Sequence, residues 1–213
     1  PRSARPTAAR DRSRDSLTRS RRTVTRLRAF DDDGYRCALV PGLKSSQEAR
    51  RLAEEVAFAA TRLTVLATDP PELYAEVADA GRDLEERTWL AFLIAYLYPL
   101  ERDDPFAGIA AVRTSWDDAT QLRLDDVETG PRTAHDPGRG LETVTAYRAW
   151  AERSGSQAMA FGGDPAWSPE RRFSRAFERL ALPGLHRDAR FELLASLGAL
   201  GLYELRPASL HLA

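Results

Sequence analysis

Residues 84–97 read LEERTWLAFLIAYL, and this stretch decides the fold class. Apolar side chains follow one another from Trp89 to Leu97 and leave no polar face. A helix that is apolar on every side must be surrounded by other elements, so we expect a central helix from about Asp83 to Tyr98 inside a bundle. Pro99 ends this helix, because proline cannot continue an α-helix.

Helical signals also precede the central stretch. Ser45 and Glu48 fit a capping box, in which the two residues satisfy each other's free backbone amides at a helix start. Residues 69–71, Asp-Pro-Pro, end this predicted helix, and a short helix from Glu72 follows. The inward face of the first helix is expected to consist of apolar residues at helical spacing, namely Leu52, Val56, Ala59, Ala60 and Leu63.

The remainder of the chain repeats this alternation of helix signals and breakers. A Ser-Pro pair, Ser168-Pro169, fits the cap and first position of a helix, and no run of alternating β-branched residues appears. We therefore predict an all-α domain of about seven to nine helices over residues 31–213. The expected segments are short helices from Pro105 and from Ser115, a polar loop over 123–140 with at most one helical turn, a helix over about 141–151, a tight loop over 161–165, a helix from Pro169, and a last long helix after the turn at 182–185.

Charge is distributed unevenly along the 213 residues. Between Pro1 and Arg28 ten arginines accompany two acids, a local charge of +8, whereas the rest of the chain carries about −9. From Pro1 to Arg22 the one large aliphatic residue is Leu17, which is too little apolar surface to offset the entropy of ordering. We therefore predict a disordered basic tail over residues 1–30, which attracts DNA non-specifically.

Several classes of protein are excluded by composition. The single cysteine, Cys37, excludes an internal disulfide framework and a cysteine-based zinc site. The longest strongly apolar run has nine residues, whereas a membrane span needs about 20, and the N-terminus lacks the apolar region of a secretion signal. We expect a soluble cytoplasmic protein that has no membrane span, no metal and no cofactor.

The turn ALPGLHRDA, residues 181–189, joins the last two predicted helices through Pro183-Gly184. In a helix-hairpin-helix such a glycine lets the backbone approach a DNA phosphate, which the amides opening the next helix then bind. Gly184 and His186 would lie at this contact, with Arg187 and Arg190 adding positive charge. The alternative is an ordinary turn between two helices, in which Pro-Gly is equally common.

A cluster of arginines on the preceding helix is a second candidate for binding DNA. Arg171, Arg175 and Arg179 are spaced by four residues and share one stripe, to which Arg172 lies close. The stripe could face phosphates, or it could be a solvated face paired with neighbouring acids.

Glu85 and Glu86 lie close before the aromatic run that begins at Trp89, which we expect to be buried. A carboxylate there could lie at the lip of a pocket, where desolvation raises its pKa and fits it for catalysis. The alternative is that both acids merely favour the positive end of the helix dipole.

With these pieces in order, the chain resembles the alpha-glutamyl/putrescinyl thymine pyrophosphorylase family, which is related to the helix-hairpin-helix DNA glycosylases. The resemblance rests on three stretches in the same order as in the family. They are ALVPGLKSSQEARRLAEEV (38–56), LEERTWLAFLIAYL (84–97) and ALPGLHRDARFELLASLG (181–198).

The resemblance implies a DNA glycosylase-like protein that flips a base, such as a modified thymine, and cleaves its N-glycosidic bond. Trp89 and Tyr96 would line the base pocket. The family's catalytic acid follows the hairpin, where Glu204 stands here, and Glu86 is the second candidate. The hairpin lacks the lysine of bifunctional members, so an enzyme of this kind would be a monofunctional hydrolase. Because the usual aspartate is missing, a non-catalytic nucleic-acid-binding or protein-interaction module remains the alternative.

Overall fold

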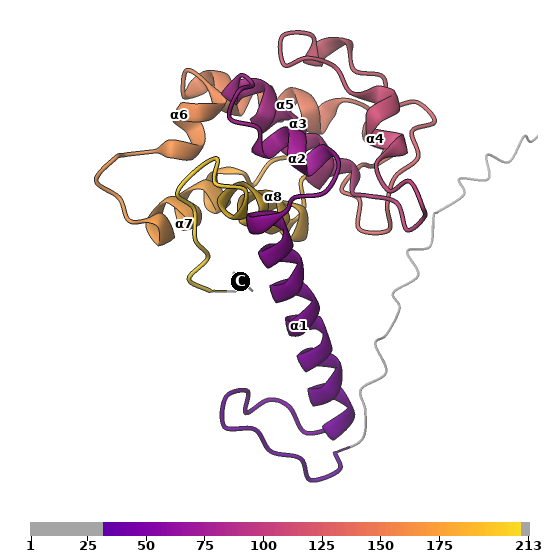
Figure 1. Ribbon diagram of the computed structural model, residues 1–213, viewed down its shortest axis with the longest axis vertical. Helices are drawn as coiled ribbons and strands as arrows, with labels where there is room; N and C mark the ends of the chain where they lie inside the picture. Colours follow the sequence, from indigo (N-terminus) through magenta and orange to yellow (C-terminus); the bar gives the residue numbers. More distant parts are fainter. Residues whose placement is uncertain (1–31, 210–213) are drawn as a thin grey trace, which may run out of the picture. The chain divides into compact units, whose positions relative to one another are not determined.

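The computed structural model describes residues 32–209, so the basic tail predicted for residues 1–30 lies outside the described part of the chain. Between residues 32 and 209 the chain forms eight α-helices and no strand, which confirms the predicted all-α class (Figure 1). The α-helices are α1 (Ser46–Thr68), α2 (Leu73–Ala78), α3 (Leu84–Leu97), α4 (Ala107–Val112), α5 (Glu142–Arg153), α6 (Gln157–Gly162), α7 (Pro169–Arg179) and α8 (Arg187–Ala199), with 3₁₀ turns η1 (Ala119–Gln121) and η2 (Pro137–Arg139).

The chain divides into two units, residues 1–52 and 53–213. In the described part of the first unit, Asp33 anchors the start of α1. Its carboxylate accepts hydrogen bonds from the Ser46 backbone N–H at 2.9 Å and from the Ser46 hydroxyl at 2.5 Å. These bonds lower the pKa of Asp33 because they stabilise its charged form.

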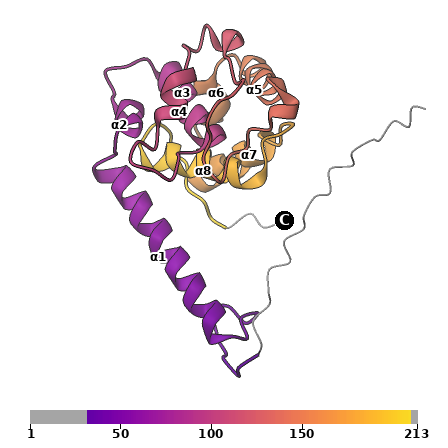
Figure 2. The same cartoon turned by 90° about the vertical axis from the view of Figure 1, so that its right-hand side faces the viewer.

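Helix α3 is the centre of the second unit, as predicted. Its N-cap is Asp83, whose carboxylate accepts from the backbone N–H groups of Glu85 and Glu86 at 2.9 and 3.1 Å. Every residue from Thr88 to Leu97 is buried, so α3 is enclosed on all sides. Helices α2, α4, α6 and α8 all contact it, and α8 does so most extensively (Figures 1 and 2).

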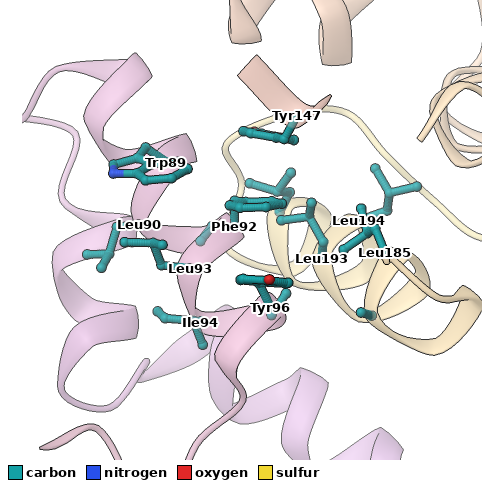
Figure 3. Close-up of a cluster of buried hydrophobic side chains, with 14 of the residues drawn as sticks. Trp89, Leu90, Phe92, Leu93, Ile94, Tyr96, Tyr147, Leu185, Leu193 and Leu194 are labelled. Carbon is teal, nitrogen blue, oxygen red and sulfur yellow. The ribbon is translucent and has the colours of Figure 1, made fainter. Parts of the chain in front are cut away.

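A stack of aromatic rings runs through this core. Phe92 lies face to face with Tyr147 of α5, with ring centroids 3.8 Å apart and planes 14° apart (Figure 3). On the other side of Phe92 the ring of Tyr96 follows at 5.5 Å, nearly parallel. Trp89 stacks beside Phe92 at 5.4 Å. The stack therefore joins α3 to α5 and fixes the side chains at both ends of the central helix.

Helices α7 and α8 form the C-terminal pair. Ser168 caps α7 by accepting from the Arg171 backbone N–H at 3.3 Å, and Pro169 takes the first helical position, as predicted. Phe173 and Phe177 of α7 are buried, and Phe191 of α8 lies edge-on to Phe173 at 5.5 Å. The turn between these helices is the predicted Pro183-Gly184 turn.

Three elements differ from the prediction. The apolar face of α1 is largely exposed, with Val56 at 59%, and Leu66 is the one side chain of this helix that is described as buried. The segment expected to start a helix at Ser115 forms only the 3₁₀ turn η1. Residues 157–162, where no helix was predicted, form α6.

None of the helices between residues 32 and 209 combines the length and the apolar character that a bilayer span requires.

Candidate functional site

A cavity of about 250 Å³ lies at the start of α3 and includes Glu86 in its wall; we call it the Glu86 cavity. The predicted base-pocket residue Trp89 also lines it, so the structure brings one candidate acid and one candidate aromatic together. The cavity combines an apolar wall of Trp89, Leu90 and Leu93 with the charged residues Glu76, Arg82, Glu86, Arg87 and Arg113 and the hydroxyl residues Thr114 and Ser115.

Glu86 is held by one oxygen only. Its Oε1 accepts a hydrogen bond from the Trp116 backbone N–H at 2.9 Å, and Oε2 has no hydrogen bond within residues 32–209. The indole N–H of Trp89 donates to the Thr114 carbonyl at 2.9 Å, which fixes the ring in the cavity wall. One carboxylate oxygen therefore remains available beside an immobilised aromatic ring.

Two arginines at the same cavity are held by a single carboxylate. Glu76 pairs with Arg82 at 2.8 Å and with Arg113 at 3.1 Å. Arg87 instead donates to the backbone carbonyls of Val77 and Ala78, at 2.7 and 3.2 Å, and so caps the end of α2. The cavity residues carry three arginines against two glutamates, so their summed charge is positive.

Glu204, the first candidate for the catalytic acid, lies away from the Glu86 cavity. It follows α8, its side chain is 75% exposed, and it pairs with Arg172 at 2.5 Å. It borders a separate surface hollow formed mainly by residues 198–206. Arg172 is largely buried at 13% exposed, so this predicted DNA-binding residue ties α7 to the segment after α8.

The Pro183-Gly184 turn packs against the N-terminal part of α5. Gly184 has φ +76°, and a Cβ there would lie 2.2 Å from the Thr143 hydroxyl oxygen, so the turn requires glycine on both counts. His186 occupies the N-cap of α8, and its Nδ1 accepts from the Ala189 backbone N–H at 3.3 Å. One amide that an anion would use at this helix start is therefore already bound by a side chain.

The two arginines that follow the turn have different environments. Arg187 pairs with Asp188 at 2.8 Å. Arg190 donates to the Phe177 carbonyl at 3.1 Å and lies 4.5 Å above the Phe177 ring. Burial, and then the neighbouring Arg187, lower the pKa of Arg190. The Arg190 side chain therefore mainly contacts α7 and connects it to α8.

The arginine stripe of α7 is exposed, in contrast to Arg172. Arg171, Arg175 and Arg179 are all exposed and recur every four residues. Arg171 lies 4.9 Å over the Trp167 ring, Arg175 pairs with Glu178 at 3.1 Å, and Arg179 reaches the Ser154 hydroxyl. Of the predicted arginines, Arg171 and Arg175 thus present positive charge to solvent.

Tyr96, the second predicted base-pocket residue, is fully buried and does not line the Glu86 cavity. Its hydroxyl lies 3.0 Å from Nδ1 of His135, and both side chains are buried. Burial raises the pKa of Tyr96, partly offset by the nearby Thr143 hydroxyl. Tyr96 therefore positions a histidine that the sequence had not singled out.

Some cavity residues carried no recognisable signal in the sequence. Arg82 and Arg113 come from segments on either side of α3, and only the fold brings them to Glu76. Glu85, the neighbour of Glu86, points the other way and accepts from the backbone N–H groups of Gln157 and Ala158 at 2.9 and 2.8 Å. The two adjacent acids therefore bind different parts of the chain, and their spacing in the sequence does not predict which part each one binds.

A scan against protein-family models and searches of curated proteins and of solved structures each found no match to this chain.

Proposed function

We propose that this protein is a DNA-binding, glycosylase-like hydrolase that receives an extruded base in the Glu86 cavity. The observation that carries the proposal is the position of Glu86, with one free carboxylate oxygen, beside the fixed ring of Trp89 in the cavity wall. The resemblance to the thymine pyrophosphorylase family and its glycosylase relatives supplies the reaction class. The volume of about 250 Å³ is below the usual range for drug-sized ligands and suits a single ring.

The reaction needs a carboxylate whose position is fixed by a hydrogen bond to one oxygen while its other oxygen stays free to act. Cleavage of an N-glycosidic bond develops positive charge on the sugar, and a nearby carboxylate stabilises that charge or activates water. Oε1 of Glu86 is oriented by the Trp116 N–H, so Oε2 would act on the sugar or on water. Glu86 replaces Glu204 as the preferred acid because Glu204 lies three-quarters exposed in an ion pair.

The rim of the cavity offers positive charge for the DNA backbone. Arg82 and Arg113 remain 50% and 40% exposed although both pair with Glu76. Phosphates flanking an extruded nucleotide could bind these guanidinium groups, which are already oriented by Glu76. Binding should therefore weaken with added salt.

The test is base release from duplex DNA. The full chain is incubated with duplexes carrying normal bases or modified thymines, and abasic sites are detected by strand scission in alkali. Glu86→Gln should lower the rate roughly a hundredfold or more, because a neutral amide cannot stabilise the developing cation. The amide oxygen can still accept from the Trp116 N–H, so the fold should be retained. Glu204→Gln is the matched control and should keep the parental rate; release that depends on Glu204 and not on Glu86 would overturn the assignment.

A second candidate, a nucleic-acid-binding protein without catalysis, is favoured by the arginine stripe of α7. Arg171, Arg175 and Arg179 recur at about 6 Å along the helix axis, so they can contact successive phosphates. Replacing Arg171 and Arg175 with glutamine should weaken DNA binding and reduce its salt dependence, as measured by fluorescence anisotropy. Binding that requires the stripe, together with no base release from any duplex, would favour this candidate over the hydrolase.

A further inference from the structure

One face of α1 carries apolar and small side chains that are all exposed. In the second unit α1 comprises residues 53–68, and it packs on the hydrophobic core of that unit through Leu66, which is 2% exposed, and through the partly buried Leu63. Helical spacing places a second face on the opposite side of the helix. We call this the outer face of α1, and its members are Ala57, Phe58, Thr61, Thr64, Val65 and Thr68.

The outer face is more apolar than its three threonines suggest. The Thr64 hydroxyl donates to the Ala60 carbonyl at 2.9 Å, and the Thr68 hydroxyl donates to the Thr64 carbonyl at 2.9 Å. Because these hydroxyls are bound within the helix, the threonines offer their methyl groups to a partner. Phe58 and Val65 are 59% and 41% exposed on the same face. An apolar helix face is normally covered by another element, so this one indicates a partner.

The sizes of the side chains on this face are self-complementary. Phe58 is bulky, whereas Ala57, Thr61 and Thr64, within two turns of it, are small. A second copy of α1 running antiparallel, with its Thr61 opposite Phe58, places each phenyl ring against the small residues of the other helix. Such a pairing is two-fold symmetric, which is the commonest symmetry of soluble dimers.

The charges of α1 favour the antiparallel orientation. Glu54 lies on the outer face, one turn before Phe58, and a parallel pair would place it beside Glu54 of the second copy. In the antiparallel pair Glu54 lies opposite Val65 of the second copy. The two Glu54 side chains are then separated by eleven residues of helix, about 16 Å along the axis. The opposed helix dipoles favour the same orientation.

Oppositely charged residues flank the face at matching positions. Glu55 and Arg62 are seven residues apart and lie on the same edge of the outer face. The antiparallel pair brings Glu55, which is 56% exposed, toward Arg62 of the second copy, which remains 27% exposed although it pairs with Glu192. Each dimer would contain this contact twice, so the charges are complementary as well as the shapes.

We propose that the outer face of α1 joins two copies of this chain in an antiparallel dimer. Leu63 and Leu66 hold the core of each copy on the opposite side of its helix, so both cores lie outside the helix pair. A contact of about four helical turns buries less than the roughly 800 Å² per partner of a standard interface, so we expect a dimer of micromolar affinity. The proposal does not depend on DNA binding or on Glu86.

The test is sedimentation velocity of the full chain without DNA, from low to high micromolar concentration. The parent chain should change from the monomer mass to the dimer mass as its concentration rises. Phe58→Gln should weaken the dimer roughly a hundredfold or more, because each dimer loses two buried rings. Val56→Gln is the matched control, since Val56 is also 59% exposed but lies on the side of Leu63. Glutamine favours helix, and circular dichroism should show equal helicity in both variants.

Pulsed electron paramagnetic resonance tests the orientation. Nitroxides are attached to Ala60→Cys or to Asp69→Cys in a Cys37→Ser chain, at two exposed positions outside the outer face. In an antiparallel pair the two copies of residue 60 lie at nearly the same height, whereas those of residue 69 lie about 28 Å apart along the axis. The distance between labels should therefore be clearly longer at residue 69. A parent chain that stays monomeric, an equal effect of Phe58→Gln and Val56→Gln, or equal distances at the two labels would each overturn the proposal.

Discussion

Phe92 is fully buried between the parallel rings of Tyr147 and Tyr96, at centroid distances of 3.8 and 5.5 Å. Truncating Phe92 to alanine removes one ring from the stack and leaves a void that rigid neighbours cannot fill. We expect Phe92→Ala to lower the free energy of unfolding by about 3–5 kcal/mol, as measured by urea denaturation. Met159→Ala, at a side chain that is 65% exposed, should change it by less than about 0.5 kcal/mol. Equal effects would show that the stack is not a stabilising centre.

The stability of the fold should depend on pH through His135. Its pKa is lowered by burial, so between that folded value and about 6.5, the ordinary value, the unfolded chain binds more protons than the folded one. The free energy of unfolding should therefore rise with pH across this window and fall as the pH drops below about 6.5.

The measurement is urea denaturation at several pH values between about 5 and 7.5, where carboxylates contribute little. His135→Gln cannot titrate, so its stability should vary less with pH than that of the parent chain. An unchanged pH dependence in the variant would assign the effect to another group.

At the scale of elements, the short helix α6 depends on a distant carboxylate. Glu85 accepts from the first two backbone N–H groups of α6 and from the side chain of Gln157, which is fully buried. Glu85→Ala leaves these donors unsatisfied and should cost about 1–3 kcal/mol in unfolding free energy. Hydrogen exchange at the Gln157 and Ala158 amides should accelerate, while amides in the middle of α3 keep their relative protection. Glu86→Gln should leave the exchange of α6 unchanged.

At the Pro183-Gly184 turn, the energetic cost of backbone strain can be measured separately from the cost of a steric collision. Gly184 and Gly201 have similar positive φ angles, +76° and +71°, but a Cβ would collide only at Gly184, where the Thr143 hydroxyl is 2.2 Å away. Gly201→Ala should cost about 1 kcal/mol from backbone strain, and Gly184→Ala clearly more. Combining Gly184→Ala with Thr143→Ala should recover most of the difference, because the second substitution removes the hydroxyl with which the new Cβ collides. Thermal unfolding of the three variants tests this, and equal costs at the two glycines would contradict it.

Local signals predicted most elements correctly. The continuous apolar run of α3 and the Ser168-Pro169 start of α7 depend on neighbours in sequence, and both are confirmed. Helix α6 was missed although Ser156 caps it locally, because six residues are too few for a periodic apolar signal and its first turn is also held by Glu85, more than seventy residues earlier in the chain. The apolar face of α1 was placed in the core by its spacing, yet Val56 lies exposed, since periodicity does not identify what a face packs against.

The candidate site was predictable only in part, for the same reason. Glu86 and Trp89 are three residues apart on one helix, so helical spacing already placed them on one face. Arg82 and Arg113, which share Glu76, are brought together by tertiary packing. His135 lies in a polar loop with no periodic signal, and its contact with Tyr96 spans 39 positions.

At the scale of the whole molecule, charge separates the first 28 residues, at +8, from the remainder, at about −9. Deleting residues 1–28 should weaken binding to duplex DNA and flatten its dependence on salt concentration, because fewer counterions are released. Anisotropy titrations between about 50 and 200 mM salt measure both quantities. A scrambled segment of the same composition should restore binding if charge alone is responsible. If the affinity for DNA is unchanged after the deletion, this segment does not contribute to DNA binding.

The position of Trp89 gives the protein a built-in optical reporter. Its indole lines the Glu86 cavity, donates to the Thr114 carbonyl, and lies 5.6 Å from the Trp116 ring and 6.2 Å from that of Tyr147. Chromophores this close couple their transitions, so the near-ultraviolet circular dichroism should be strong and sensitive to small rotations of the rings. A molecule entering the cavity would lie against the wall that includes Trp89 and should change the fluorescence yield of this indole. Binding at the Glu86 cavity can therefore be followed through the intrinsic emission of the chain.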